Sequence, residues 1–254
     1  GALYKTYFAK KMGIDPKDIV VVSCMPCTAK KTEIFREDQN ASGYPDVDVV
    51  LTTRELARLI KHYGIDFKSL PDEQFDAPLG IGSTAGLLFG ATGGVMEAAL
   101  RTVKEILDGK ELDNLDFKSV RGVKGVKKAT VELGGKPVKV VVAHGVENAH
   151  TVMEQLKAGK LNDVAFIEIM CCPGGCVTGG GQPIQPAEVR NNIDLKAERA
   201  KALYNADKKA PLRKSHDNPE VKELYADFLG EPNGHLAHEL LHTHYVDRSK
   251  KRID

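Results

Sequence analysis

The cysteines of the chain stand in two groups, and each group directly follows a short apolar run. The first pair comes after the run 19–22, and the second group, of three, comes after the run 164–170. Short, continuous apolar runs are typical of strands buried on both faces of a parallel sheet. Because ligands in open α/β sheets bind beyond the carboxyl ends of the strands, we expect the two groups to converge on one site. The five residues are Cys24, Cys27, Cys171, Cys172 and Cys176.

The rest of the pattern also alternates strand and helix signals. A further apolar run, 47–51, leads to Thr52 and Glu55, which have the spacing of a helix capping box. Helices are expected over about 95–108 and 146–158, each followed by a glycine that can end it. This alternation is typical of α/β proteins.

The pair Gly134-Gly135 lies between two alternating stretches and predicts an antiparallel β-hairpin. From Pro186 the sequence becomes polar and helical, with about 22 residues in a first helix. We therefore predict an α/β fold with two lobes, each a mostly parallel sheet flanked by helices, the active site between them and a helical C-terminal extension. The pattern left open whether that extension wraps on the main body or projects from the surface. The domain boundary is placed between residues 1–185 and 186–254.

Charge and hydropathy exclude two kinds of partner. With 36 Lys+Arg against 35 Asp+Glu the net charge is +1, which argues against nucleic acid. No 20-residue apolar span is present, so no membrane span is predicted.

The chain opens without Met inside an amphipathic pattern that includes Leu3 and Tyr7, so we expect it to lack its N-terminal part. Clustered, odd-numbered cysteines favour metal or thiol chemistry in a reducing compartment, and hence a cytoplasmic location.

The second cysteine group lies in a glycine-rich loop. Cys172-Pro173-Gly174-Gly175-Cys176 continues into three more glycines at 179–181. Glycines let a backbone approach a bulky cofactor and turn its N–H groups toward an anion. Iron-sulfur clusters are anionic and are held mainly by Cys thiolates, so this loop suits one. A glycine-rich turn with incidental buried cysteines is the alternative.

The first group has two further interpretations. Cys24-Met25-Pro26-Cys27 is a C-x-x-C at a strand-to-helix junction, the arrangement of a thioredoxin-like redox pair. That interpretation gives the second group no role. Cys24 alone could be a small buried hydrophobe.

Both groups resemble signatures of one family. Residues 25–33 (Met-Pro-Cys-Thr-Ala-Lys-Lys-Thr-Glu) resemble the second signature of FeFe hydrogenases, and residues 168–183 resemble the third. The stretch 83–97 is similar to the same family, and the tail segments 212–216 and 238–245 resemble its small subunit. The resemblance implies a catalytic H-cluster domain, incomplete at its N-terminus, over 1–185 and a small-subunit-like segment over 186–254.

The resemblance also implies a cofactor: a 4Fe-4S cubane joined to a diiron subcluster that carries CO, cyanide and a bridging dithiolate. By position, Cys27 and Cys172 resemble cubane ligands, and Cys176 resembles the ligand that bridges to the diiron unit. Lys30 resembles the cation that is hydrogen-bonded to a cyanide.

The remaining residues implied by the resemblance are apolar. Met25 and Met170 resemble thioethers packed around the diiron unit, and Phe89 resembles part of its wall; ordinary core packing is compatible with these roles. The family's first signature, which supplies the fourth cubane ligand and a proton-relay thiol, is absent from these residues. Cys24 and Cys171 stand where small apolar residues are expected.

The tail contains a second metal motif. His238-Glu239-Leu240-Leu241-His242 is a literal H-E-x-x-H, the pattern of zinc peptidases. It lies near the end of the chain and within the segment that resembles a hydrogenase tail. A polar helix whose leucines pack inward is therefore the favoured interpretation.

The resemblance thus implies an iron-sulfur oxidoreductase that reduces protons reversibly to H2. Its predicted partners are an electron carrier such as ferredoxin and the maturation proteins that supply the diiron unit. These residues alone are expected to be inactive, because one cubane ligand and the relay thiol are absent. The alternatives are a thiol-disulfide oxidoreductase, a zinc peptidase and a non-catalytic iron-sulfur or sensory relative.

Overall fold

The computed structural model describes residues 1–247 of the chain, which form two compact units. Unit 1 comprises Gly1–Tyr63 and the C-terminal segment from Glu223, and unit 2 comprises Gly64–Lys222. The predicted domain boundary at 185/186 rests on the change to a polar, helical sequence at Pro186 and on the family resemblance, and it stays a prediction. The last seven residues of that tail, 248–254, lie outside the described part. Within residues 1–247, no helix is both long and apolar enough to cross a membrane.

Unit 1 is built on a two-stranded parallel sheet. β1 (Val22–Met25) pairs with β2 (Val49–Thr52) in register from Val22 opposite Val49. β2 runs directly into α3 (Thr53–His62), where Thr52 and Glu55 form the predicted capping box. The unit begins with the helical segments η1 (Tyr4–Phe8), α1 (Ala9–Met12) and η2 (Pro16–Asp18).

β1 differs from the strand that was predicted. It begins at Val22 rather than Ile19, and its residues alternate between exposed and half-buried. Val22 is 48% exposed. The prediction of a strand buried on both faces was wrong: within residues 1–247, β1 pairs with β2 alone, and one face of β1 is exposed.

The C-terminal segment packs within unit 1. It contains η6 (Tyr225–Leu229) and α10 (His235–Leu241), which follow α9 (Pro219–Leu224). The ring of Phe228 lies 5.5 Å from that of Tyr7, between centroids. Of the two arrangements left open for the tail, this part therefore wraps onto the body of its own unit.

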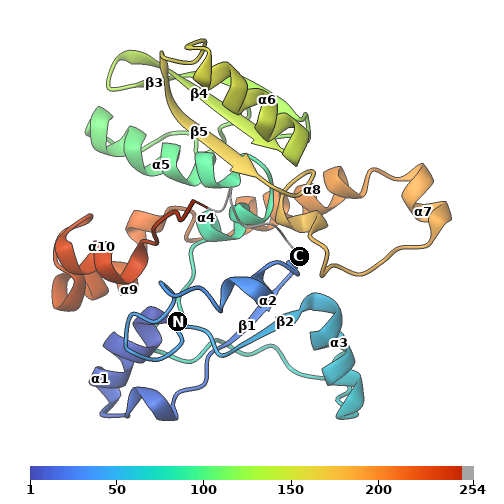
Figure 1. Cartoon of the computed structure of the whole chain (residues 1–254), viewed down its shortest axis with the longest axis vertical. Helices are drawn as coiled ribbons and strands as arrows, with labels where there is room; N and C mark the ends of the chain where they lie inside the picture. Colours follow the sequence, from blue (N-terminus) through green and yellow to red (C-terminus); the bar gives the residue numbers. More distant parts are fainter. Residues whose placement is uncertain (248–254) are drawn as a thin grey trace. The chain divides into compact units, whose positions relative to one another are not determined.

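Unit 2 is built on a three-stranded mixed sheet in the order β3-β4-β5. β3 (Val126–Leu133) and β4 (Lys136–His144) form the predicted hairpin through Gly134-Gly135, and β5 (Val164–Met170) is parallel to β4. Helices α5 (Gly94–Asp108) and α6 (Val146–Lys157) cover opposite faces of this sheet (Figure 1).

The core of unit 2 is centred on β4. Val140 and Val142 pack on the α5 side, whereas Val141 and Ala143 pack on the α6 side. The strand buried on both faces is therefore β4. The prediction gave that place to β5, but β5 lies at the sheet edge, where Phe166 and Ile169 are each 41% exposed.

The remaining helices of unit 2 follow the polar pattern of the sequence with one difference. The single long helix expected after Pro186 is divided into α7 (Ala187–Asn192) and α8 (Leu195–Lys209). Asp194 caps α8 by accepting hydrogen bonds from two backbone N–H groups, which stabilises a new helix start there. The shorter elements are α4 (Thr84–Leu87), η3 (Leu88–Gly90), η4 (Cys176–Thr178) and η5 (Ser215–Asp217).

Candidate metal centre

In unit 1, Cys27 and Lys30 line one pocket. Cys27 stands two residues after the end of β1, and Lys30 begins the short helix α2 (Lys30–Glu33). The pocket has a volume of about 570 Å³. Its lining residues are Cys27, Ala29, Lys30, Thr32, Glu33, Arg36, Tyr245 and Val246. Lys30 and Arg36 bring positive charge to this lining and Glu33 brings negative charge, so the thiol of Cys27 lies in a charged pocket.

Lys30, one of the two cations of this pocket, is held by an exposed ion pair. The Nζ of Lys30 lies 2.7 Å from the Oε2 of Glu33, and the two side chains are 42% and 40% exposed. Pairs this exposed contribute little to stability, so Lys30 can exchange Glu33 for another anion at small cost. Cys24 lies on β1 and is exposed, so its interpretation as a buried hydrophobe was wrong.

In unit 2, the second cysteine group forms a tight loop after β5. Gly174 has φ 86° and Gly175 has φ 100°, values that L side chains rarely adopt. A Cβ on Gly175 would also lie 2.7 Å from the backbone N of Thr92. The N–H of Gly175 donates to the carbonyl of Cys172 at 3.0 Å, which closes the turn. The two glycines are therefore required by the shape of this loop.

A buried histidine at the end of β4 is hydrogen-bonded to the backbone of this loop. The N–H of Gly174 donates to Nδ1 of His144 at 3.0 Å, and Nε2 of His144 lies 3.0 Å from the carbonyl of Val123. Since a carbonyl only accepts, Nε2 carries the proton and Nδ1 is the acceptor. This pattern fixes His144, which is 5% exposed, as the neutral Nε2–H tautomer. Sequence reasoning gave His144 no role.

A buried carboxylate joins the cysteine strand to the start of α5. The two oxygens of Glu168 accept the N–H groups of Gly93 and Met96 at 2.6 and 2.7 Å. A carboxylate at a helix N-terminus is stabilised both by these bonds and by the helix dipole. Glu168 therefore fixes the segment 93–96 against the strand that ends at the second cysteine group.

A lysine lies beside this carboxylate. Lys127 is 9% exposed, and its Nζ donates to the carbonyls of Gly122 and Thr92 at 2.7 and 3.2 Å. Burial lowers the pKa of Lys127 to about 8, and the nearby charge of Glu168 opposes that shift. Lys127 and Glu168 together form a polar layer between the sheet and the start of α5.

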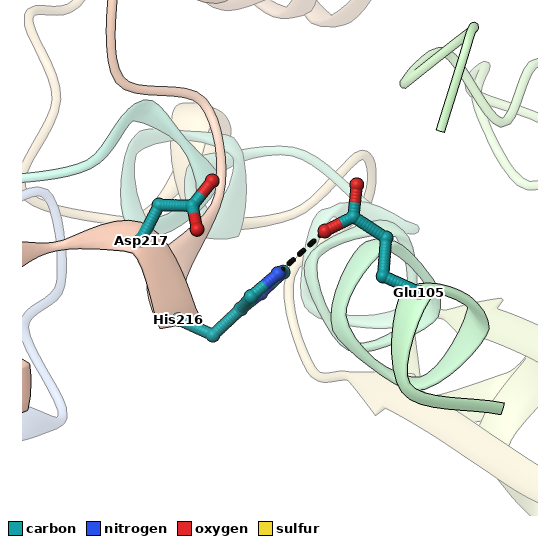
Figure 2. Close-up of side chains that lie close together, drawn as sticks. All are labelled: Glu105, His216 and Asp217. Atoms are coloured by element: carbon teal, nitrogen blue, oxygen red, sulfur yellow. Dashed lines mark hydrogen bonds and ion pairs between the residues drawn. The ribbon is translucent and has the colours of Figure 1, made fainter. Parts of the chain in front are cut away.

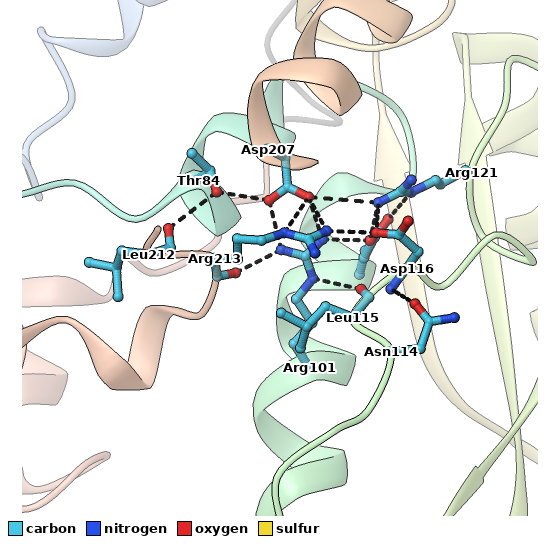
Figure 3. Close-up of polar contacts among 10 residues, drawn as sticks. Thr84, Arg101, Asn114, Leu115, Asp116, Arg121, Asp207, Leu212 and Arg213 are labelled. Atoms are coloured by element: carbon cyan, nitrogen blue, oxygen red, sulfur yellow. Dashed lines mark hydrogen bonds and ion pairs between the residues drawn. The ribbon is translucent and has the colours of Figure 1, made fainter. Parts of the chain in front are cut away.

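A buried ion network joins α5 to α8 within unit 2 (Figure 3). The guanidinium of Arg101 bonds both Glu97 and Asp207 at 2.8 Å, and all three side chains are fully buried. Arg213 adds a second guanidinium to Asp207 at 2.7 Å. Burial alone would raise the pKa of Asp207, but hydrogen bonds from Arg101, Arg213 and Thr84 outweigh it and hold that pKa well below its ordinary value.

Within residues 1–247, one group of three metal-ligand side chains gathers within 4.8 Å, and it is Glu105, His216 and Asp217 (Figure 2). Lys214 already neutralises it, because its Nζ lies 3.0 Å from Glu105 and 2.7 Å from Asp217. His216 is held between Glu105 at 2.7 Å and the hydroxyl of Thr102 at 2.9 Å. The group is a complete polar contact between α5 and η5 rather than an open metal site.

The H-E-x-x-H motif forms a partial histidine pair in unit 1. Nδ1 of His238 lies 2.6 Å from Nδ1 of His242, and both side chains are exposed. His242 is already past the end of α10 and has extended backbone angles. The residues described bring no third Cys, His, Asp or Glu ligand atom within 4.8 Å of this pair. The arrangement therefore lacks the third protein ligand of a catalytic zinc site.

The predicted site residues are divided between the two units. Cys27, Met25 and Lys30 lie in unit 1, whereas the other predicted residues, Cys172, Cys176, Met170 and Phe89, lie in unit 2. Met25 and Met170 are half-buried at the ends of β1 and β5, and Phe89 is 44% exposed on η3. Convergence of the two cysteine groups and the role of each residue stay predictions.

Both units thus have the same local construction: a β-strand whose carboxyl end runs into a cysteine-bearing loop. Such loops, with thiols of two groups and a glycine turn, define a protein of the cysteine-ligated metal-cluster class. Comparison with known proteins gives the family. "Iron only hydrogenase large subunit, C-terminal domain" matches residues 1–180, and "Iron hydrogenase small subunit" matches residues 193–248. The chain belongs to the iron-only, or FeFe, hydrogenase family.

Individual relatives agree with this assignment. The NADP-reducing hydrogenase subunit HndD of Solidesulfovibrio fructosivorans is 50% identical over 98% of this chain and 42% of its own length. The solved structure of HydA(deltaEFG), described for stepwise FeFe-hydrogenase H-cluster assembly, is 42% identical, with a TM-score of 0.78 over 96% of this chain and 67% of its own. The cytosolic Fe-S cluster assembly factor narfl of Xenopus tropicalis is 31% identical over 96% of this chain and 51% of its own length. The chain therefore spans about half or less of these curated relatives.

Proposed function

We propose that this chain is the cluster-binding part of an FeFe hydrogenase that interconverts protons and H2. Electrons would come from an external carrier such as ferredoxin, and maturation proteins would supply the diiron unit, both in the cytoplasm. The observation that supports this most is the pocket of unit 1, which both Cys27 and Lys30 line. A thiol there can bind iron, and an ammonium beside it can bind the anionic ligands of a diiron unit.

The donor set fits the proposed cofactor. Cys27, Cys172 and Cys176 would hold a 4Fe-4S cubane, and Cys176 would bridge to the diiron unit. The loop between Cys172 and Cys176 takes its shape from two glycines whose positive φ and close neighbours exclude side chains, so the two thiols are carried on one compact turn. When bound, the cofactor supplies the redox chemistry, whereas the protein supplies binding, orientation and electrostatics.

The residues of the chain would then act by position and charge. The Nζ of Lys30 would leave Glu33 and donate to an anionic ligand of the diiron unit, which the exposure of both side chains makes inexpensive. Met25, Met170 and Phe89 would contribute apolar surface that limits access of water. In unit 2, His144 and Glu168 would keep the cysteine loop in one conformation through Gly174 and the start of α5.

Anaerobic reconstitution with iron and sulfide tests the cubane assignment. Cys27→Ala should lose most of the visible cluster absorption, because it removes a ligand. Cys24→Ala is the matched control three residues earlier and should keep that absorption. The opposite result, with loss in Cys24→Ala and retention in Cys27→Ala, would show that the ligand has been assigned wrongly.

A non-catalytic role in iron-sulfur cluster assembly or sensing is the second candidate, and the similarity to narfl over 96% of the chain favours it. The two functions differ in whether the chain holds a diiron unit. We expect a preassembled diiron complex added to the cubane-loaded chain to be retained through gel filtration, with its CO and cyanide infrared bands. Lys30→Ala should keep the cubane and lose those bands. Since only three of four expected cubane ligands are present, H2 turnover by these 254 residues is not expected and is not the readout.

A further inference from the structure

The hydroxyl of Thr92 is buried without a partner. Thr92 is 1% exposed. Among the buried side-chain nitrogen and oxygen atoms of residues 1–247, its Oγ1 is the one without a hydrogen-bond partner. Buried hydroxyls in folded proteins are nearly always hydrogen-bonded, because leaving one unpaired costs its desolvation. An orphan of this kind points to a group that binds there.

Thr92 touches the middle of the cysteine loop. Its N–H donates to the carbonyl of Gly174 at 3.0 Å, and a Cβ on Gly175 would lie 2.7 Å from the same nitrogen. Since Gly174 and Gly175 are flanked by Cys172 and Cys176, Thr92 lies directly against the segment that carries both thiols.

The usual partner of such a hydroxyl is already occupied. A threonine next to a helix start commonly accepts a backbone N–H of the first turn. Here Glu168 takes the N–H groups of Gly93 and Met96, and the carbonyl of Thr92 accepts from Lys127. The hydroxyl therefore has no structural role in capping α5 and remains available as a donor.

We propose that the Thr92 hydroxyl donates a hydrogen bond to a ligating thiolate of the Cys172–Cys176 loop when that thiolate holds the cubane. This inference rests on the proposed function. Cluster and thiolate sulfurs are anionic acceptors, so they complement a donor and not another acceptor. Because a hydrogen bond to sulfur stabilises the reduced, more negative cluster, Thr92 acts as a tuning residue that raises the reduction potential.

The test compares three forms of the 254-residue chain after reconstitution with iron and sulfide: wild type, Thr92→Val and Thr92→Ser. Valine keeps the shape and removes the hydroxyl, whereas serine keeps the hydroxyl. The midpoint of the cubane is measured by spectroelectrochemical titration. Pulsed electron paramagnetic resonance of the reduced cluster in H2O and D2O detects an exchangeable proton near the sulfur. Thermal unfolding of the cluster-free proteins is measured in parallel.

Thr92→Val should shift the midpoint to more negative potential and lose the exchangeable-proton coupling, and Thr92→Ser should restore both. Without cluster, Thr92→Val should unfold at the same or a higher temperature than wild type, because it removes an unpaired buried hydroxyl. Equal midpoints in wild type and Thr92→Val, or equal shifts in the valine and serine variants, overturn the inference alone. Absence of any cubane from the wild-type chain overturns the proposed function as well.

Discussion

The two cysteine-bearing regions are held in very different ways. In unit 2 the loop is fixed through Gly174, whose N–H bonds neutral His144 and whose carbonyl accepts from Thr92. In unit 1, Cys27 lies between a four-residue strand and a four-residue helix, and α2 is tied to β2 by the half-exposed side chain of Lys31, whose Nζ donates to Val50 at 2.9 Å.

Under the proposed function, this difference would decide how the two units share ligation of the cluster. A loop whose backbone is already bonded on both sides pays little ordering entropy when it binds a cluster, so unit 2 is preorganised. The proposed ligand of unit 1, Cys27, rests on short, exposed elements that would adjust to a cluster held by the loop of unit 2. We therefore expect changes beneath the loop of unit 2 to cost more than equivalent changes in unit 1.

The largest effect is expected from the buried ion network. Asp207→Ala removes the acceptor that faces Arg101 and Arg213, and it leaves a fully buried guanidinium with one fewer partner. Breaking a buried pair in this way costs about 3–5 kcal/mol of unfolding free energy. Urea denaturation measures this loss of unfolding free energy. The control is Glu154→Ala, which removes an exposed ion pair with Lys157 on α6 and should change the unfolding free energy by less than about 0.5 kcal/mol. Similar small losses in both variants would show that the network does not hold α8 to α5.

The next effect compares two glycines with positive φ, one in each unit. Gly175→Ala combines the strained φ of 100° with a contact of 2.7 Å to backbone, so a loss of about 2–4 kcal/mol is expected. Gly43→Ala in unit 1 has φ 84° but nothing within 4 Å of its new Cβ, so only the backbone cost of about 1–2 kcal/mol applies. Only Gly175→Ala should also lower the amount of cubane bound per chain. Equal cluster binding by both variants would remove the argument for a preorganised loop.

Much of the fold was accessible from sequence because its signals are local. The capping box at Thr52 and Glu55, the Gly134-Gly135 hairpin and the bounds of β5 all depend on residues close together in the chain. The two cysteine groups were also recognisable, because they carry their pattern within a few residues. The positions of the strands within the sheets could not be predicted in this way. Whether β4 or β5 is the buried strand depends on which of them has a neighbour on both sides, and that is not a local property of the sequence.

The buried polar residues that hold the cysteine loop and the start of α5 in place were missed for a different reason. His144, Glu168 and Lys127 are polar residues in strands, and the partners that tie them to the loop and to the start of α5 are remote in sequence: 30 residues away for His144, 72 and 75 for Glu168 and 35 for Lys127. No local pattern therefore assigns them. One signal was present: Glu168 interrupts an otherwise apolar run immediately before the cysteines. A charge in a predicted buried strand calls for a buried partner, and the N-terminus of α5 is that partner.

The smallest effect is a pH dependence that separates two adjacent lysines of β3. Lys127 is buried and its folded-state pKa of about 8 lies below the ordinary value of 10.5. Between these two values the unfolded chain binds the proton and the folded chain does not. The unfolding free energy of wild type should therefore rise with pH across this window, by at most about 1.4 kcal/mol per pH unit from this group.

Lys127→Met lacks the titrating group and should show a flatter profile from pH 8 to 10.5. Lys128→Met, at the exposed neighbour, should keep the wild-type slope. Denaturation midpoints at several pH values give the comparison, and parallel profiles for wild type and Lys127→Met would mean that the lysine beneath the loop is hydrated in the folded state.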